Sequence, residues 1–159
     1  MAQKGKYVYE WPRPMVTADA AVFAFFEGRP HLLLIQRKRD PYKDRWALPG
    51  GFVEIDEDLP DGVARELAEE TGLTNVSLEQ FRAFGRPDRD PRGRTITVAY
   101  FGITEKDRQP IKAADDAADA RWFDTDNLPP MAFDHDEITR CAIERLTQTE
   151  VYRKHMDHA

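Results

Sequence analysis

The chain has 159 residues and a formal net charge of −6, and 41% of its residues are hydrophobic. This length predicts one domain with a substantial core, and the negative charge argues against non-specific nucleic-acid binding, which needs a basic surface. The single cysteine, Cys141, excludes an internal disulfide. The amino terminus has no signal-peptide core, and the longest apolar run, residues 20–26, is too short to span a bilayer. We therefore expect a cytoplasmic protein without a membrane segment.

The order of the predicted elements favours an α+β fold. Strands are expected at residues 16–26, 32–36, 47–53, 76–84, 95–103 and 120–123. One helix is expected at residues 58–71, between the third and fourth of these strands, and a second begins at Asp134. Strands around one central helix, followed by a late second helix, predict a mixed sheet packed between helices.

Both predicted helices have an apolar stripe and a recognisable terminus. The stripes are Leu59, Val63 and Leu67 in the first helix and Ile138, Cys141, Ala142 and Leu146 in the second. Gly72 is the expected C-cap of the first helix. Asp134, followed three residues later by Glu137, predicts a capping box at the start of the second.

The central helix carries the most informative residues. Glu66, Glu69 and Glu70 stand at positions i, i+3 and i+4, so their carboxylates project from one helix face. Because like charges on one face repel one another, a hard divalent cation with oxygen ligands would remove that penalty, and Mg²⁺ or Mn²⁺ fits best. An acidic helix face is often only solvated, so the residues around these glutamates decide between the two interpretations.

Those surrounding residues resemble the Nudix box of the nucleoside-diphosphate-X hydrolases. Gly51 is followed after five residues by Glu57, and after seven more by Arg-Glu-Leu-Ala-Glu-Glu-Thr-Gly-Leu at residues 65–73. The resemblance implies an α/β/α sandwich and metal-dependent hydrolysis of a diphosphate. It also implies that the carbonyl of Gly51 is a metal ligand.

The box residues have the following expected roles. Glu66 and Glu70 are the expected primary metal ligands, and Glu69 completes the set. Glu57 either binds the metal through water or pairs with Arg65. Arg65 is expected to orient Glu66 or Glu69 by a bidentate hydrogen bond, with a helix-surface ion pair as the alternative.

A general base is expected outside the box. In several Nudix enzymes it lies on a loop before a strand that starts with tryptophan, which resembles residues 112–123 here. Asp116 is the first candidate and Asp115 the second, and a solvated acidic loop is the alternative. No Ser–His pair or reactive cysteine indicates a covalent intermediate.

Several flanking segments resemble one branch of the family, which includes ADP-ribose pyrophosphatases, the Nudix domain of bifunctional nicotinamide-mononucleotide adenylyltransferases, and Nudix-type regulators of NAD metabolism. The segments are residues 14–19, 45–52, 87–97, 115–123 and 132–138. The reaction implied is the hydrolysis of ADP-ribose to AMP and ribose 5-phosphate. Arginines that are candidates for binding phosphate, or alternatively are only solvated, are Arg37, Arg39, Arg86, Arg92 and Arg94.

The expected domain organisation is an amino-terminal segment at residues 1–14, the Nudix domain at residues 15–150 and a frayed tail at residues 151–159. Residues 7–11 are rich in aromatic side chains without an obvious internal partner, so we expect a homodimer. Adenine would stack on these aromatics or on Phe84, although core packing is the stronger expectation for Phe84.

Two other functions compete with ADP-ribose hydrolysis. One is hydrolysis of modified nucleoside triphosphates, because the metal site and diphosphate recognition are shared. The other is a non-catalytic ADP-ribose sensor that controls transcription. Such regulators carry an added DNA-binding domain and usually a degraded box, whereas this box is intact and the chain is expected to lack room for that domain. The expected partners are a nucleotide substrate and a second copy, without nucleic acid or membrane.

Overall fold

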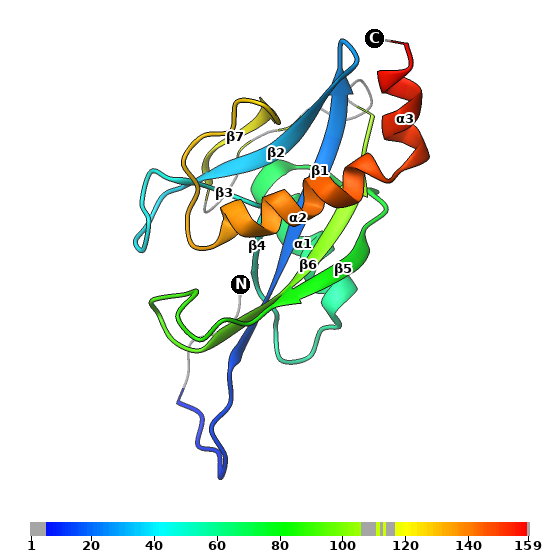
Figure 1. Ribbon diagram of the computed structural model, residues 1–159. Helices are drawn as coiled ribbons and strands as arrows, with labels where there is room; N and C mark the ends of the chain where they lie inside the picture. The colour runs from blue at the N-terminus through cyan, green and yellow to red at the C-terminus, as the bar shows by residue number, and fades with distance from the viewer. Residues whose placement is uncertain (1–5, 106–110, 112, 114–116, 159) are drawn as a thin grey trace.

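The computed structural model describes residues 6–105, 111, 113 and 117–158 (Figure 1). Within these residues, the fold consists of a seven-stranded sheet and three helices. The strands are β1 (Met15–Phe26), β2 (Arg29–Arg37), β3 (Trp46–Ala47), β4 (Gly50–Phe52), β5 (Glu79–Phe84), β6 (Thr95–Ile103) and β7 (Ala117–Asp124). The helices are α1 (Leu59–Thr71), α2 (His135–Thr147) and α3 (Glu150–Met156).

The sheet is mixed and is organised around β1. The strand order is β3-β2-β1-β6-β5, while β4 pairs with β1 and β7 pairs with β2. Strand β1 runs parallel to β6, whereas its pairings with β2 and β4 are antiparallel. The register of β1 and β4 places Asp19 opposite Gly50. The segment that starts at Gly50 and leads to α1, called the box loop below, therefore begins against the middle of the sheet.

Alternate residues of β1 face two separate hydrophobic cores. Ala20 and Val22 pack in a cluster with residues of α1, while Ala21 and Phe23 pack in a cluster with residues of α2. This alternation follows from the pleat of a strand, in which successive side chains point to opposite faces. The two helices therefore cover opposite faces of the sheet, as Figure 1 shows, and the predicted sandwich is confirmed.

Most predicted elements are present, with changed bounds. The strand expected at residues 47–53 is divided into β3 and β4 by Leu48 and Pro49, and the strand expected from residue 76 starts at Glu79. Helix α1 is capped by Asp58 and ends at Gly72, whose φ of 76° is left-handed, as predicted for a C-cap glycine. Phe84 is buried in the core, which confirms the expectation that it packs there.

Two predictions at the carboxyl-terminal end are wrong. The capping box of α2 does not form, because Asp134 makes no side-chain cap bond and its carboxylate instead accepts hydrogen bonds from Arg89. The frayed tail is instead helix α3, capped by Thr149. This helix packs against β1, since the His155 and Phe25 rings stack with centroids 4.0 Å apart.

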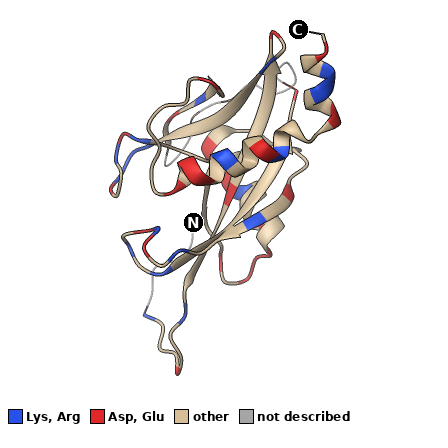
Figure 2. Ribbon diagram, viewed as in Figure 1, with Lys and Arg blue, Asp and Glu red and all other residues tan. Residues whose placement is uncertain are grey.

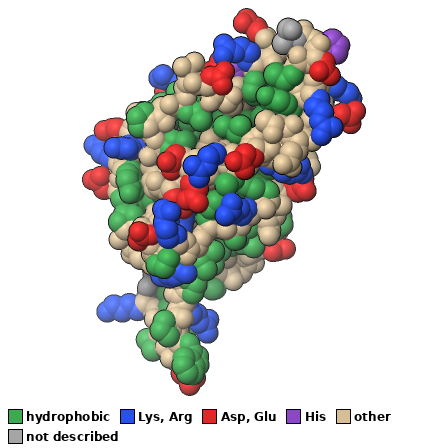
Figure 3. Space-filling view, in the orientation of Figure 1, with side chains coloured by type: hydrophobic (Ala, Val, Ile, Leu, Met, Phe, Trp, Pro, Cys, Tyr) green, Lys and Arg blue, Asp and Glu red, His purple; other side chains and the backbone are tan. Residues whose placement is uncertain are grey.

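Residues 6–14 project away from the body of the domain (Figure 1), and hydrophobic side chains gather at the tip of this projection (Figure 3). Trp11 is 73% exposed, and the exposed rings of Tyr7 and Tyr9 stack on each other. Pairing of two copies through this segment stays a prediction. On the face drawn in Figure 2, acidic and basic residues are interspersed along α2 and the loops. Among the described residues, no helix combines the length and hydropathy that crossing a bilayer requires.

Candidate active site

Two glycines bring the backbone of the box loop close to the acidic residues of α1. The Gly50 N–H donates a 3.0 Å hydrogen bond to Oε2 of Glu70. At φ 157° this residue lies so close to β1 that a Cβ would collide with the Ala18 carbonyl and the Asp19 carboxylate. A Cβ on Gly51 would lie 2.6 Å from Oε1 of Glu66. Glycine at both positions therefore allows the loop to pass between β1 and the carboxylates.

Arg65 is the central cation of the box. Its Nη2 and Nε donate to the two oxygens of Glu57 at 2.7 and 3.0 Å, which makes a bidentate pair. Its Nη1 donates to Glu66 at 3.0 Å and to Glu69 at 3.2 Å. The bidentate partner of Arg65 is thus Glu57, whereas Glu66 and Glu69 each receive a single bond. One guanidinium therefore fixes the orientation of several box carboxylates together.

Glu57 is committed to structural hydrogen bonds. Besides the bonds from Arg65, it accepts a 2.8 Å hydrogen bond from the Glu54 N–H. The bonds from Arg65 are the main reason that the pKa of Glu57 falls to about 2. Of the two roles that the sequence left open, the structure places Glu57 in the ion pair with Arg65.

Glu66 and Glu70 are in a different electrostatic position. Burial raises the pKa of Glu66, although the Arg65 hydrogen bond opposes the change. Burial raises the pKa of Glu70 well above its ordinary value, and the neighbouring carboxylates of Glu66 and Asp19 raise it further. Burial thus disfavours the ionised form of both carboxylates, and the nearby arginines offset only part of that cost. The donor set of hard oxygens therefore fits a divalent cation.

The cation site is not assembled in advance. Among the described residues, no three His, Cys, Asp or Glu side chains already converge as a ligand set. One oxygen of Glu66 and one of Glu69 are hydrogen-bonded to Arg65. The second oxygen of each carboxylate is not bonded to Arg65, so each glutamate can offer that oxygen to a cation while it keeps its bond to the guanidinium.

A narrow cleft of ≈ 90 Å³ lies beside Glu70 and is lined by two of the predicted arginines, Arg37 and Arg92. Both guanidiniums lie over the ring of Phe133, at 4.8 and 5.2 Å from its centroid. Burial lowers the pKa of Arg37, and the nearby Arg92 lowers it further. Because two neighbouring cations repel each other, an anion in the cleft would be bound favourably.

The other predicted residues are not brought to the cleft. Arg39, Arg86 and Arg94 are absent from its lining. Arg86 pairs with Asp88 and Glu137, and Arg94 donates to the Gly85 carbonyl. Asp115 and Asp116, the candidate bases, lie outside the described residues.

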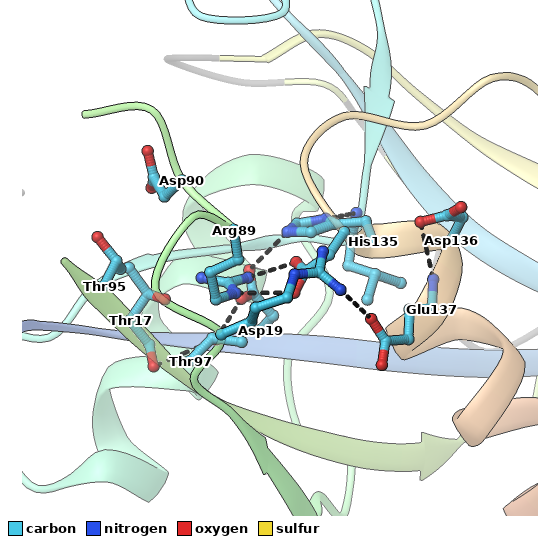
Figure 4. Close-up of polar contacts among 12 residues, drawn as sticks. Thr17, Asp19, Arg89, Asp90, Thr95, Thr97, His135, Asp136 and Glu137 are labelled. Carbon is cyan, nitrogen blue, oxygen red and sulfur yellow. Dashed lines mark hydrogen bonds and ion pairs between the residues drawn. The ribbon is translucent and has the colours of Figure 1, made fainter. Parts of the chain in front are cut away.

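Sequence reasoning missed a buried polar group in the cleft wall, in which Asp19, Arg89 and His135 converge (Figure 4). Thr97 donates a hydrogen bond to Asp19. His135 accepts a 3.0 Å bond from the Leu48 N–H through Nδ1, and its Nε2 lies 3.9 Å from the Asp19 carboxylate. Burial lowers the pKa of His135, which favours the neutral ring. The sequence signal that could have indicated this group is Asp19, an aspartate in the largely apolar strand β1.

A buried ion pair attaches the loop between β5 and β6 to the start of α2. Arg89 donates to Asp134 at 2.9 Å through Nε and at 2.7 Å through Nη2, and their side chains are only 3% and 4% exposed. In the same loop Asp90 accepts hydrogen bonds from Arg92, the shortest of 2.7 Å. The loop therefore has fixed contacts at both of its cleft-lining arginines, Arg89 and Arg92.

Comparison with known proteins agrees with this geometry, since residues 15–145 match the NUDIX domain family. The chain belongs to the Nudix family. It is 43% identical over 120 residues to an ADP-ribose pyrophosphatase of Methanocaldococcus jannaschii, a match that covers 76% of this chain and 70% of the relative. It is 36% identical over 149 residues to the ADPR responsive transcriptional repressor NtrR of Acinetobacter baylyi, covering 90% of this chain and 58% of the repressor.

Solved structures with the same fold support the assignment to the Nudix hydrolases. The NUDIX domain of Shewanella oneidensis NrtR, solved in complex with ADP ribose, superposes with a TM-score of 0.80 at 33% identity and covers 86% of this chain and 91% of that domain. A bifunctional NMN adenylyltransferase/ADP ribose pyrophosphatase from Francisella tularensis gives a TM-score of 0.73 at 35% identity, covering 86% of this chain and 42% of that enzyme. The predicted family and sandwich fold are therefore confirmed for this Nudix hydrolase.

Proposed function

We propose that this Nudix hydrolase cleaves the diphosphate of ADP-ribose to give AMP and ribose 5-phosphate. The observation that carries the proposal is the arrangement of charge in the cleft. Arg37 and Arg92 line the cleft together with the buried Glu70, and Glu66 lies close enough to Glu70 to raise its pKa. A diphosphate needs cationic donors for its oxygens, and the carboxylates provide ligands for a divalent cation. The similarity to proteins named for ADP-ribose supports the choice of substrate.

The cation would be Mg²⁺ or Mn²⁺, and the residues that would hold it are Glu66, Glu69, Glu70 and the carbonyl of Gly51. When bound, the cation neutralises diphosphate charge and lowers the pKa of the attacking water. Arg65 would orient Glu66 and Glu69 through the hydrogen bonds described above, with Glu57 holding Arg65 from the other side. Glu57 remains a candidate for a water-mediated contact.

The remaining roles belong to the substrate side and the water. Arg37 and Arg92 would bind phosphate oxygens, because both guanidiniums line the cleft beside each other and a guanidinium matches the geometry of a phosphate group. Arg39, Arg86 and Arg94 stay candidates for contacts with the outer part of the substrate. Asp116 is proposed as the base that accepts the proton of the water.

Incubation of the protein with ADP-ribose and Mg²⁺ should yield AMP and ribose 5-phosphate in equal amounts, as measured by chromatography. A chelator should stop the reaction, and Arg92→Ala should raise KM more than it lowers kcat because the arginine binds ground-state charge. A control variant, Arg121→Ala, changes an arginine that pairs with Asp119 away from the cleft. The proposal is wrong if ADP-ribose is bound but not hydrolysed, or if it is neither bound nor hydrolysed.

A sensor function is the second candidate, because similarity to the NtrR repressor extends over 90% of this chain. The sensor would bind ADP-ribose tightly without turnover. The intact box favours catalysis. If ADP-ribose is bound but not hydrolysed, the protein would therefore be assigned as a sensor.

We further propose that two copies associate through the exposed aromatic segment at residues 7–11, and that residues 15–150 form the Nudix domain. A cytoplasmic location stays a prediction from the sequence. The absence of a nucleic-acid partner likewise stays a prediction from the sequence, and a DNA-binding measurement tests it because one relative is a transcriptional repressor.

A further inference from the structure

A second and larger pocket adjoins the cleft. Its volume is ≈ 640 Å³, compared with ≈ 90 Å³ for the cleft, and Phe133 lines both. Apolar side chains such as Met131 and Ile143 form much of its lining, and Tyr42 stands beside Phe133. Pockets that hold small molecules usually have volumes of about 300–1,000 Å³ and mostly apolar walls with a few polar groups. The pocket, unlike the cleft, is therefore large enough for a nucleoside.

Two aromatic residues of the pocket have unusual backbone conformations: Tyr42, and Phe133, which also lines the cleft. Tyr42 has φ 62° and Phe133 has φ 52°, which are left-handed values that bulky residues rarely adopt. Their rings meet edge to face with centroids 4.9 Å apart. Such strained conformations persist only where the surrounding structure maintains them, and they cluster at ligand-binding positions. Glycine would adopt either conformation with less strain than the aromatic residue does.

Charged groups of the pocket complement a flat aromatic ligand. Arg45 and Arg140 line the pocket, and neither has an ion pair within the described part of the chain. A guanidinium plane stacks well on a nucleobase, and so does an aromatic ring. On the cleft side, Arg37 and Arg92 lie over Phe133, so phosphates bound by them would be next to the pocket.

We propose that this pocket is the nucleobase subsite, in which Tyr42 and Phe133 contact the base of the substrate while its diphosphate lies in the cleft. The proposal rests on the proposed function, because it places the two halves of one nucleotide in two adjoining cavities. It assigns Tyr42 to base recognition and gives it no part in the cleavage step.

The test is the binding of AMP and of ribose 5-phosphate, measured by calorimetry for the full chain and two variants. Tyr42→Gly removes the ring and relieves its left-handed backbone, so the fold should be retained. The matched control is Asp44→Gly, because Asp44 has φ 66° on the same loop and does not line the pocket. We expect Tyr42→Gly to raise the Kd of AMP about tenfold and to leave that of ribose 5-phosphate unchanged, because stacking on a base is lost.

The outcomes separate this proposal from the proposed function. If the wild type does not bind AMP, or if Tyr42→Gly binds AMP as tightly as Asp44→Gly does, the pocket is not the base subsite, whether or not ADP-ribose is hydrolysed. An equal loss of affinity for ribose 5-phosphate also overturns the proposal, because the effect would then not involve the base. Failure to hydrolyse ADP-ribose, with selective loss of AMP binding in Tyr42→Gly, overturns the proposed function alone.

Discussion

Replacement of Glu70 by glutamine is expected to lower the rate of ADP-ribose hydrolysis by at least about a hundredfold, because a charged ligand of the divalent cation is lost. The same change should stabilise the metal-free protein. Burial is the main reason that the pKa of Glu70 is raised, and a glutamine has no ionised form to bury. The amide oxygen can still accept the hydrogen bond that the Gly50 N–H donates to Glu70.

The pH dependence of that stability has a definite sign. Because the folded pKa of Glu70 lies above its ordinary value of 4.5, the folded state binds the proton more tightly than the unfolded state does. The stabilising contribution is therefore complete below about pH 4.5 and is lost as the pH rises through the folded pKa. Burial raises the pKa of Glu66 in the same direction.

Thermal unfolding of the chelator-treated protein across pH 4.5 to 8 measures this effect. The wild type should lose stability relative to Glu70→Gln as the pH rises, and Mg²⁺ should restore it. Glu144→Gln, an exposed change on α2, is the control and should follow the wild type. Near-normal turnover by Glu70→Gln would contradict the assignment of this carboxylate to the cation.

Replacement of Arg89 by alanine is expected to lower the free energy of unfolding by about 3–5 kcal/mol, because it leaves the buried carboxylate of Asp134 without its partner. Both side chains are almost inaccessible, so water cannot replace the lost hydrogen bonds. Replacing both residues together, as Arg89→Met with Asp134→Leu, should recover most of the loss, since no charge then remains buried.

Urea unfolding of the single and double variants measures the interaction. Lys154→Ala is the matched control, because it removes an exposed ion pair with Glu150 on α3, and it should change stability little. A loss in Arg89→Ala no larger than in the control would show that the buried pair does not hold the loop between β5 and β6. So would a double variant that is as unstable as Arg89→Ala.

The elements predicted well from the sequence are those whose signals are local. Helix α1 has a regular apolar spacing and a glycine at its end, and its C-cap is where the sequence indicates, while its first residue is Leu59 and not Asp58. The box glutamates follow from helical geometry and from the fixed spacing to Gly51. Neither feature depends on contacts with distant parts of the chain.

The features that the sequence could not give depend on long-range partners. Arg89 and Asp134 are 45 residues apart, and Leu48 and His135 are 87 apart. No local pattern distinguishes Arg89 from the other arginines of its loop, although Arg89 is buried against α2 and Arg86 pairs at the surface. The capping box failed for the same reason, since Asp134 had a stronger partner elsewhere. Helix α3 was missed because its packing against Phe25 is not visible in a short polar segment.

Selection of ADP-ribose by the cleft is tested most directly by the ratio kcat/KM, measured with Mg²⁺ for ADP-ribose, nucleoside triphosphates and dinucleotides. We predict the highest value for ADP-ribose, with AMP and ribose 5-phosphate as the products. A higher value for a triphosphate, with release of pyrophosphate, would keep the Nudix fold and the cation site but would contradict the proposed substrate.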